Sequence, residues 1–141
     1  MSLKSFLKQS AILPENQKVV VSNRFVDEDG KPEEWEIQPI TATENDKLME
    51  ECMKRVAVAG KRGQFTETMD RGKYMRYLAA ACVVYPNLND PEIQNSYGAM
   101  SAEELIGKML FPGELTALLA AVNEMTGFDA PIEDKVDEAK N

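Results

Sequence analysis

The chain has 141 residues, of which 43% are hydrophobic and 28% charged, and its formal net charge is −8 at pH 7. This length and composition are typical of one globular domain with an ordinary hydrophobic core. No apolar run reaches the roughly 20 residues of a membrane span, and the N-terminus lacks the features of a signal peptide. We therefore predict a cytoplasmic protein with no membrane partner.

The charges are unevenly distributed along the chain. Residues 27–51 carry ten acids and two bases, residues 52–76 two acids and seven bases, and residues 77–141 eleven acids and three bases. Nucleic-acid binders usually present a dominant basic face, so the overall acidity argues against a nucleic-acid partner. The basic block at 54–76 is either a solvated face or a contact for an acidic partner.

No motif predicts catalysis or a bound metal. The chain has no histidine, which removes the commonest proton-transfer residue and transition-metal ligand. Residues 27–30 are similar to part of a calcium loop, but Phe25 would then occupy the first ligand position. Residues 60–61 are similar to part of a phosphate loop, but Arg62 replaces the hydroxyl residue that would hold magnesium. We predict no catalytic, cofactor-binding or metal-binding residue, and no enzymatic activity.

The N-terminal part reads as a β-hairpin. Residues 18–26 are rich in β-branched side chains, residues 34–40 alternate polar with apolar side chains, and residues 27–32 have turn chemistry. We expect Trp35 and Ile37 to lie on the buried face. Two strands alone are marginal in water, so the hairpin must pack on helices or join another sheet.

Helices are predicted from Thr43 onward. Thr43 is a candidate N-cap, and apolar residues follow at helical spacing to about residue 56. Glycines break this pattern over 57–68, where we predict a mobile loop that could include a short extended piece. The next helix begins near residue 70 and continues to Tyr85, where Pro86 ends it.

Three shorter helices complete the predicted domain. Asp90 and a following proline start a helix to about Tyr97, and Ser101 starts another with a capping box. The last helix begins at Pro112 and ends at Gly127.

The predicted fold class is α+β, with an N-terminal β-hairpin at about 18–40 packed on a mainly helical domain of four to five helices. We expect one domain over 1–128, followed by an acidic tail without fixed structure over 129–141.

The sulfur-containing residues allow two interpretations. Cys52 and Cys82 fall inside predicted helices with no second thiol near either in sequence, so we predict reduced, buried thiols. Met100, Met109 and Met125 lie among the last helices. They are either core residues or part of a partly exposed groove, because flexible thioethers can repack around different apolar partners.

Several segments, in this order and spacing, resemble a known family. They are Ser-Leu-Lys-Ser-Phe-Leu at 2–7, Val-Ser-Asn-Arg-Phe at 21–25, Ala-Ala-Cys-Val-Val-Tyr-Pro-Asn-Leu at 80–88, Ser-Tyr-Gly at 96–98 and Met-Leu-Phe-Pro-Gly-Glu at 109–114. On these residues the chain resembles the XkdN-like tail assembly chaperones of contractile-tailed phages and prophages. The resemblance spans nearly the whole chain.

The resemblance implies a non-enzymatic protein without cofactors in the host bacterial cytoplasm. Such a protein would bind the tape measure protein and keep it soluble until the tail tube polymerises around it. A longer form made by ribosomal frameshifting would add a contact with the tail tube protein. A homo-oligomer remains an open alternative.

Five apolar residues of the last two helices are the candidate partner-binding set. We expect some of them to be core residues and some to contact the partner. They are Leu105, Met109, Leu115, Leu118 and Val122. The alternatives are a structural tail or baseplate component and an acidic protein-binding adaptor.

Overall fold

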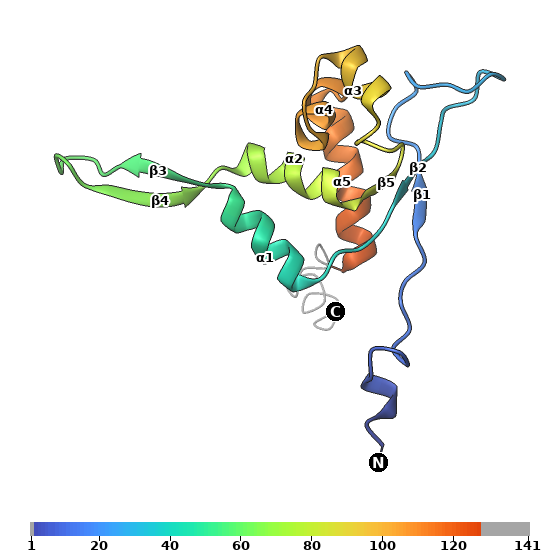
Figure 1. Ribbon diagram of the computed structural model, residues 1–141, viewed down its shortest axis with the longest axis horizontal. Coiled ribbons are helices and arrows are strands. Elements are labelled where there is room, and N and C mark those ends of the chain that lie inside the picture. The colour runs from blue at the N-terminus through green and yellow to red at the C-terminus, as the bar shows by residue number, and fades with distance from the viewer. Residues whose placement is uncertain (1, 128–141) are drawn as a thin grey trace, which may run out of the picture.

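The predicted α+β class is confirmed by the computed structural model, which describes residues 2–127 (Figure 1). The predicted tail at 129–141 lies outside the described residues. The helices are α1 (Ala42–Glu51), α2 (Arg71–Cys82), α3 (Pro91–Tyr97), α4 (Ala102–Met109) and α5 (Pro112–Thr126), with a short 3-10 helix η1 (Lys4–Phe6) near the N-terminus. The strands are β1 (Gln17–Val19), β2 (Trp35–Ile37), β3 (Met53–Ala57), β4 (Phe65–Met69) and β5 (Val83–Tyr85).

The predicted N-terminal strand pair is confirmed, but its strands are shorter than expected. Strand β1 pairs with β2 in antiparallel register, with Val19 opposite Trp35. Trp35 and Ile37 are buried, as predicted. The first strand ends at Val19 instead of continuing to residue 26, because the chain then turns inward and buries Val21. A single antiparallel bridge between Val26 and Pro32 closes the acidic turn that precedes β2.

A third strand joins this sheet where the sequence predicted the end of a helix. Helix α2 ends at Cys82, and Val83–Tyr85 pairs with β2 to give the strand order β1-β2-β5. The predicted continuation of the helix to Tyr85 is therefore wrong. Two valines favour extended backbone, and a residue that precedes proline is pushed out of the α region. These local preferences favour the extended backbone that Val83–Tyr85 needs in order to pair with β2.

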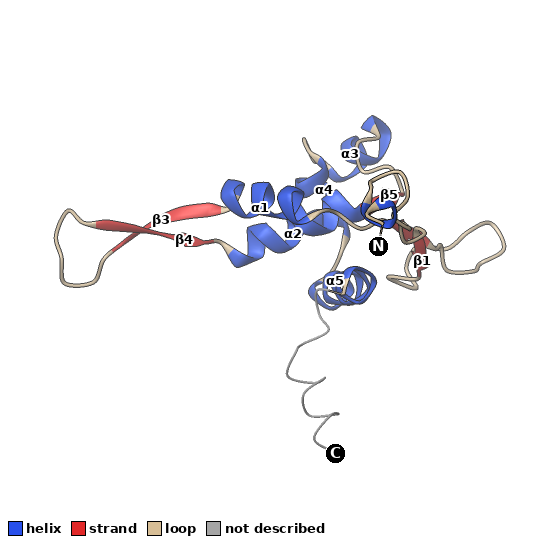
Figure 2. Cartoon of the chain, turned by 90° about the horizontal axis from the view of Figure 1, so that it is seen from below, coloured by secondary structure: helices blue, strands red, loops and turns tan. Residues whose placement is uncertain are grey.

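A second hairpin replaces the predicted loop. Helix α1 begins after Thr41, not at Thr43, and ends at Glu51. The chain then forms β3 and β4, which pair antiparallel from Met53 opposite Met69 to Ala57 opposite Phe65. The predicted helix to residue 56 is therefore wrong. The loop predicted at 57–68 is confined to residues 58–64, and the extended piece that it could include is the beginning of β4. This hairpin projects far from the helical body (Figure 1, Figure 2).

The later helices begin and end where the sequence predicted. The Asp90 carboxylate accepts hydrogen bonds from the first turn of α3, and the Ser101 hydroxyl accepts one from the Glu104 amide at 3.1 Å. The capping box at Ser101 is incomplete, because the Glu104 carboxylate accepts from the Met100 amide instead. Gly127 ends α5 with a φ of 73°, which glycine adopts without steric cost.

The core lies between the β1-β2-β5 sheet and helices α2, α4 and α5. Both cysteines are buried and free, as predicted. Burial raises the pKa of Cys82 to about 11, so this thiol is neutral at physiological pH. Among the described residues, no buried side-chain nitrogen or oxygen lacks a hydrogen-bond partner.

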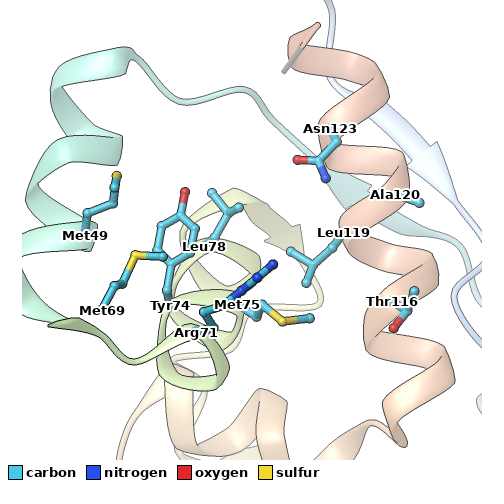
Figure 3. A pocket seen from close by; sticks show the side chains of 10 residues that line it. All are labelled: Met49, Met69, Arg71, Tyr74, Met75, Leu78, Thr116, Leu119, Ala120 and Asn123. Atoms are coloured by element: carbon cyan, nitrogen blue, oxygen red, sulfur yellow. The ribbon is translucent and has the colours of Figure 1, made fainter. Parts of the chain in front are cut away.

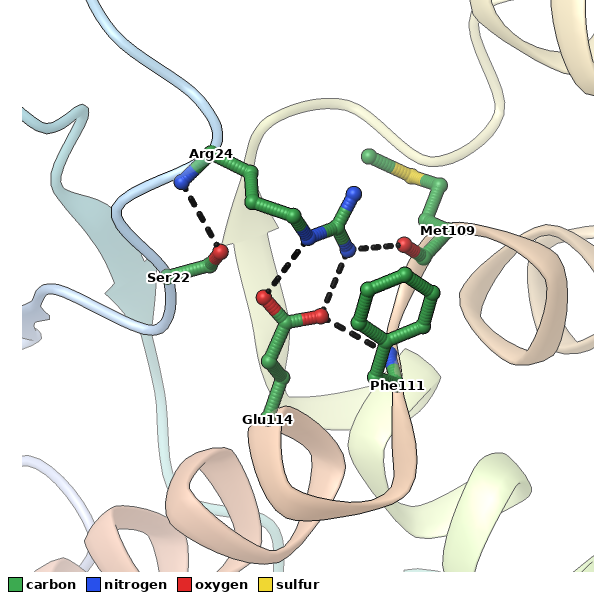
Figure 4. A network of polar contacts seen from close by, with 5 residues as sticks. All are labelled: Ser22, Arg24, Met109, Phe111 and Glu114. Carbon is green, nitrogen blue, oxygen red and sulfur yellow. Dashed lines mark hydrogen bonds and ion pairs between the residues drawn. The ribbon is translucent and has the colours of Figure 1, made fainter.

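An ion pair joins the N-terminal segment to the start of α5 (Figure 4). The Arg24 guanidinium donates to both carboxylate oxygens of Glu114, at 3.0 and 2.5 Å, and to the Met109 carbonyl at 2.7 Å. It also lies 4.1 Å from the ring centre of Phe111. The Phe111 amide donates to the same carboxylate at 2.8 Å. One carboxylate thus caps α5 and holds the loop that follows β1.

This ion pair predicts acid-sensitive stability. The hydrogen bond from Arg24 lowers the pKa of Glu114 from 4.5 to about 2. Because the folded-state pKa is depressed, its stabilising contribution is present above about pH 4.5 and is lost as the pH falls toward 2. In Glu114→Gln, chemical denaturation should show a smaller loss of stability across this range than in wild type. Glu124→Gln, an exposed change on the same helix, is the control and should leave the Arg24–Glu114 ion pair and its acid sensitivity in place.

Candidate functional site

An apolar groove opens between helices α1, α2 and α5 beside the root of strand β4 (Figure 3). Its main cavity has a volume of about 590 Å³. The lining residues are Met49, Met69, Arg71, Tyr74, Met75, Leu78, Thr116, Leu119, Ala120 and Asn123. Most of these side chains are apolar, and they come from four different elements.

A second cavity continues the first along α1 and α5. Its volume is about 410 Å³, and it shares Tyr74, Leu78 and Asn123 with the main cavity. Its other lining residues are Ile40, Thr41, Ala42, Asn45, Asp46, Val122 and Thr126. Because the cavities share three residues, we treat them as one continuous surface, the α1–α5 groove.

Helix spacing explains how the groove is built. Tyr74 and Leu78 lie one turn apart on α2 and therefore share a face between α1 and α5. The Tyr74 hydroxyl donates to the side-chain oxygen of Asn45 on α1, which links the two helices. Burial is the largest effect on the pKa of Tyr74 and raises it, so the phenol stays neutral and remains a donor.

The chemistry of the groove suits apolar side chains. Its methionines, Met49, Met69 and Met75, are flexible and can repack around partners of different shape. Arg71 and Asp46 are its charged residues. Across residues 2–127, no group of three or more Cys, Asp and Glu side chains is placed to hold a metal ion.

Most of the predicted partner-binding residues lie in the core. Leu105, Met109, Leu118 and Val122 are buried, and Leu115 is partly buried against the same cluster. Their burial fits the core role that was expected for some of the set. A direct contact with a partner stays a prediction, and Val122 is the member that also lines the α1–α5 groove.

Sequence reasoning missed the groove because its residues came from separate elements. Met49 lies in the helix predicted from Thr43 onward, and Tyr74 and Leu78 lie in the helix predicted from near residue 70. The methionines singled out for a groove lie elsewhere: Met109 is buried in the core, and Met100 is 87% exposed outside the groove. The helical spacing of apolar residues on α1 and α2 can be read from the sequence. The relative placement of the two helices cannot.

The basic block is divided between the projecting hairpin and helix α2. Lys54 and Arg55 lie on β3, and Lys61 and Arg62 lie in the turn that follows, all of them exposed to solvent. The Arg55 guanidinium stacks on the Phe65 ring, with 4.5 Å to the ring centre. The exposure of these four cations is expected both for a solvated face and for a contact with an acidic partner.

An apolar groove between helices can bind the apolar face of a helix from another polypeptide. Residues 3–140 match the family described as phage XkdN-like tail assembly chaperone protein. The chain belongs to this family, and the predicted resemblance is confirmed. Membership places the protein among phage tail assembly chaperones, whose role is protein binding during assembly.

Two relatives come from Bacillus subtilis strain 168. The phage-like element PBSX protein XkdN is 29% identical over 140 residues, which cover 99% of this chain and 93% of the relative. The uncharacterized protein YqbN is 31% identical over 140 residues, with the same coverage. A crystal structure of the protein YqbN superposes with a TM-score of 0.73 at 25% identity and covers 92% of this chain and 98% of that chain.

The family assignment also bears on the other functional predictions. A tail assembly chaperone acts through protein partners, in line with the predicted non-catalytic role. Within residues 2–127, no helix combines the length and apolar character needed to cross a bilayer.

The burial of Leu118 predicts a large effect on folding. Leu118 is fully buried on α5, so Leu118→Ala should lower the free energy of unfolding by about 2–5 kcal/mol, because it leaves a cavity in the core. Ala117→Ser, at the exposed neighbouring position, should change it by less than about 0.5 kcal/mol. Urea denaturation of both variants measures the difference. An equal, small effect at both positions would contradict the core placement of Leu118.

Proposed function

We propose that this chaperone binds the tape measure protein in the α1–α5 groove and keeps it soluble until the tail tube polymerises around it. The supporting observation is an open apolar groove on a protein of the tail assembly chaperone family. A long helix-rich client carries apolar stripes that would associate wrongly if they stayed uncovered. A groove that covers such a stripe suits this task.

The dimensions of the groove support a helical segment as the ligand. On α5 the lining of the main cavity runs from Thr116 to Asn123, at spacings of three, four and seven residues. A helical rise of 1.5 Å per residue makes this wall roughly 11 Å long, or about two turns. A client helix lying along it would insert two or three apolar side chains between α1 and α5, which is the helix-in-groove mode.

In this proposal most of the candidate residues do not contact the client; they pack in the core and so hold the helices that form the groove. Leu105, Met109, Leu115 and Leu118 position α4 and α5, and Val122 reaches both the core and the groove. We place the direct contacts on the groove side of α5 and on α2. Val122 is the member of the original set that belongs to this contact surface.

The setting and the other partners belong to the same proposal. The chaperone would act in the cytoplasm of the host bacterium, where its net charge of −8 helps to keep the complex soluble. A longer frameshifted form would recruit the tail tube protein. Neither step requires a catalytic group.

Co-expression with the tape measure protein of the same phage or prophage tests the proposal. Wild type should bring the tape measure into the soluble fraction and co-purify with it. Ala120→Lys should reduce the recovered complex at least about tenfold, because a lysine ammonium would enter an apolar contact. Ala120 is exposed on the groove wall, so the variant should still fold.

Ala117→Lys is the matched control. It makes the same substitution on the same helix at an exposed position outside the groove lining. Capture by this variant should equal that of wild type. If the tape measure precipitates regardless of the chaperone, or if Ala120→Lys captures it normally, the proposed site is wrong. Recovery of the protein in purified mature tails would instead favour a structural tail component.

A further inference from the structure

The first fifteen described residues form an arm that projects from the domain and carries exposed apolar side chains. Residues 2–16 are exposed throughout and run from β1 away from the helices (Figure 1). Phe6 is 81% exposed and Ile12 97% exposed. The full set of large apolar residues on this N-terminal arm is Leu3, Phe6, Leu7, Ile12 and Leu13. Chain termini that are only solvated seldom carry so many large apolar side chains, and a cluster of exposed apolar residues is typical of an interaction surface.

The arm has the pattern of a helix that binds in a groove. Leu3, Phe6 and Leu7 are spaced three and four residues apart, which places them on one helical face. Helical turns are already present, since the Phe6 amide donates to the Leu3 carbonyl at 3.0 Å and the Ala11 amide donates to the Leu7 carbonyl at 2.8 Å. Within residues 2–127, no other segment buries the apolar face of these turns: Leu3 is 78% exposed, Phe6 81% and Leu7 45%.

The arm and the groove have complementary charges. Lys4 and Lys8 are one helical turn apart on the arm. Helix α1, one wall of the groove, carries four acids and a single base over Ala42–Glu51. Asp46 of this helix lines the groove itself, whereas the other charged lining residue, Arg71, lies on α2. A helical arm could therefore place its apolar face in the groove and its lysines along the acidic wall.

We propose that the N-terminal arm of one copy docks in the α1–α5 groove of a second copy. The arm runs from β1 away from the helices (Figure 1), and it would have to turn back to reach the groove of its own chain. A second copy can be reached without this reversal. Two copies can exchange arms reciprocally, which gives a closed two-fold dimer. This dimer covers both grooves and both arms.

Arm exchange would regulate the same groove that binds the client, and this consequence rests on the proposed function. The tape measure segment and the arm cannot occupy one groove together, so client binding releases the arm and arm binding opposes the client. The free chaperone thereby keeps its apolar surface covered until a client with higher affinity displaces the arm.

Sedimentation velocity of the full chain tests the exchange without any tape measure protein. Wild type should form a dimer that dissociates on dilution. Replacement of Leu3, Phe6 and Leu7 together by serine should give a monomer. Ser5→Ala with Gln9→Ala and Ser10→Ala, which changes only polar arm residues, should leave the dimer intact. A wild-type monomer at all concentrations, or a triple-serine variant that still dimerises, would overturn the proposal.

A labelled peptide of residues 2–13 then locates the docking site. Fluorescence anisotropy should show binding to the full-length triple-serine variant, whose groove is free. Adding Ala120→Lys to that variant should weaken binding at least about tenfold, whereas adding Ala117→Lys should not. Equal binding by both would place the arm elsewhere and overturn the proposal. Because no client is present, failure here is separate from failure of tape measure capture.

Discussion

Helix α5 carries apolar residues on more of its surface than the core alone can cover, and the arrangement of the other elements follows from this. Leu118 and Val122 face the core, where α2, α4 and the sheet bury them. Ala120 is exposed on the α1–α5 groove, and Leu119, which is buried in the core cluster, also lines this groove. One helix therefore supplies both the centre of the domain and one wall of the candidate binding surface. A change in its core packing would also move the groove, so stability and binding are coupled here.

The parts of the fold that depend on local chemistry could be predicted from the sequence. Asp90, Ser101 and Gly127 mark helix ends through hydrogen bonds and backbone preferences that act within a few residues. Strand β5 depends on a pairing across more than forty residues, between Val83 and Ile37. The Val-Val-Tyr-Pro sequence contained a local signal for it, but an apolar run after a helix reads equally well as more helix.

The groove could not be predicted because no single element contains it. Tyr74 and Leu78 would have fitted a closed core as well as an open groove, since both roles require apolar residues at helical spacing. The difference is set by α1, which meets α2 through the Tyr74–Asn45 hydrogen bond and leaves α5 uncovered on that side. The β3–β4 hairpin was missed for a related reason: its exposed residues carry little hydrophobic pattern, and only its two glycine turns punctuate it.

The base of the N-terminal arm is fixed although the arm itself is uncovered. Strand β1 pairs with β2 and contacts α5. Five residues after the end of β1, Arg24 holds the following loop to Glu114 at the start of α5. The arm therefore begins at a defined place beside the helix that forms the groove wall. A fixed origin limits where a free arm can search, which lowers the entropic cost of docking into a partner that presents its groove nearby. The same anchoring leaves the domain intact when the arm is displaced, because none of the core residues comes from the arm.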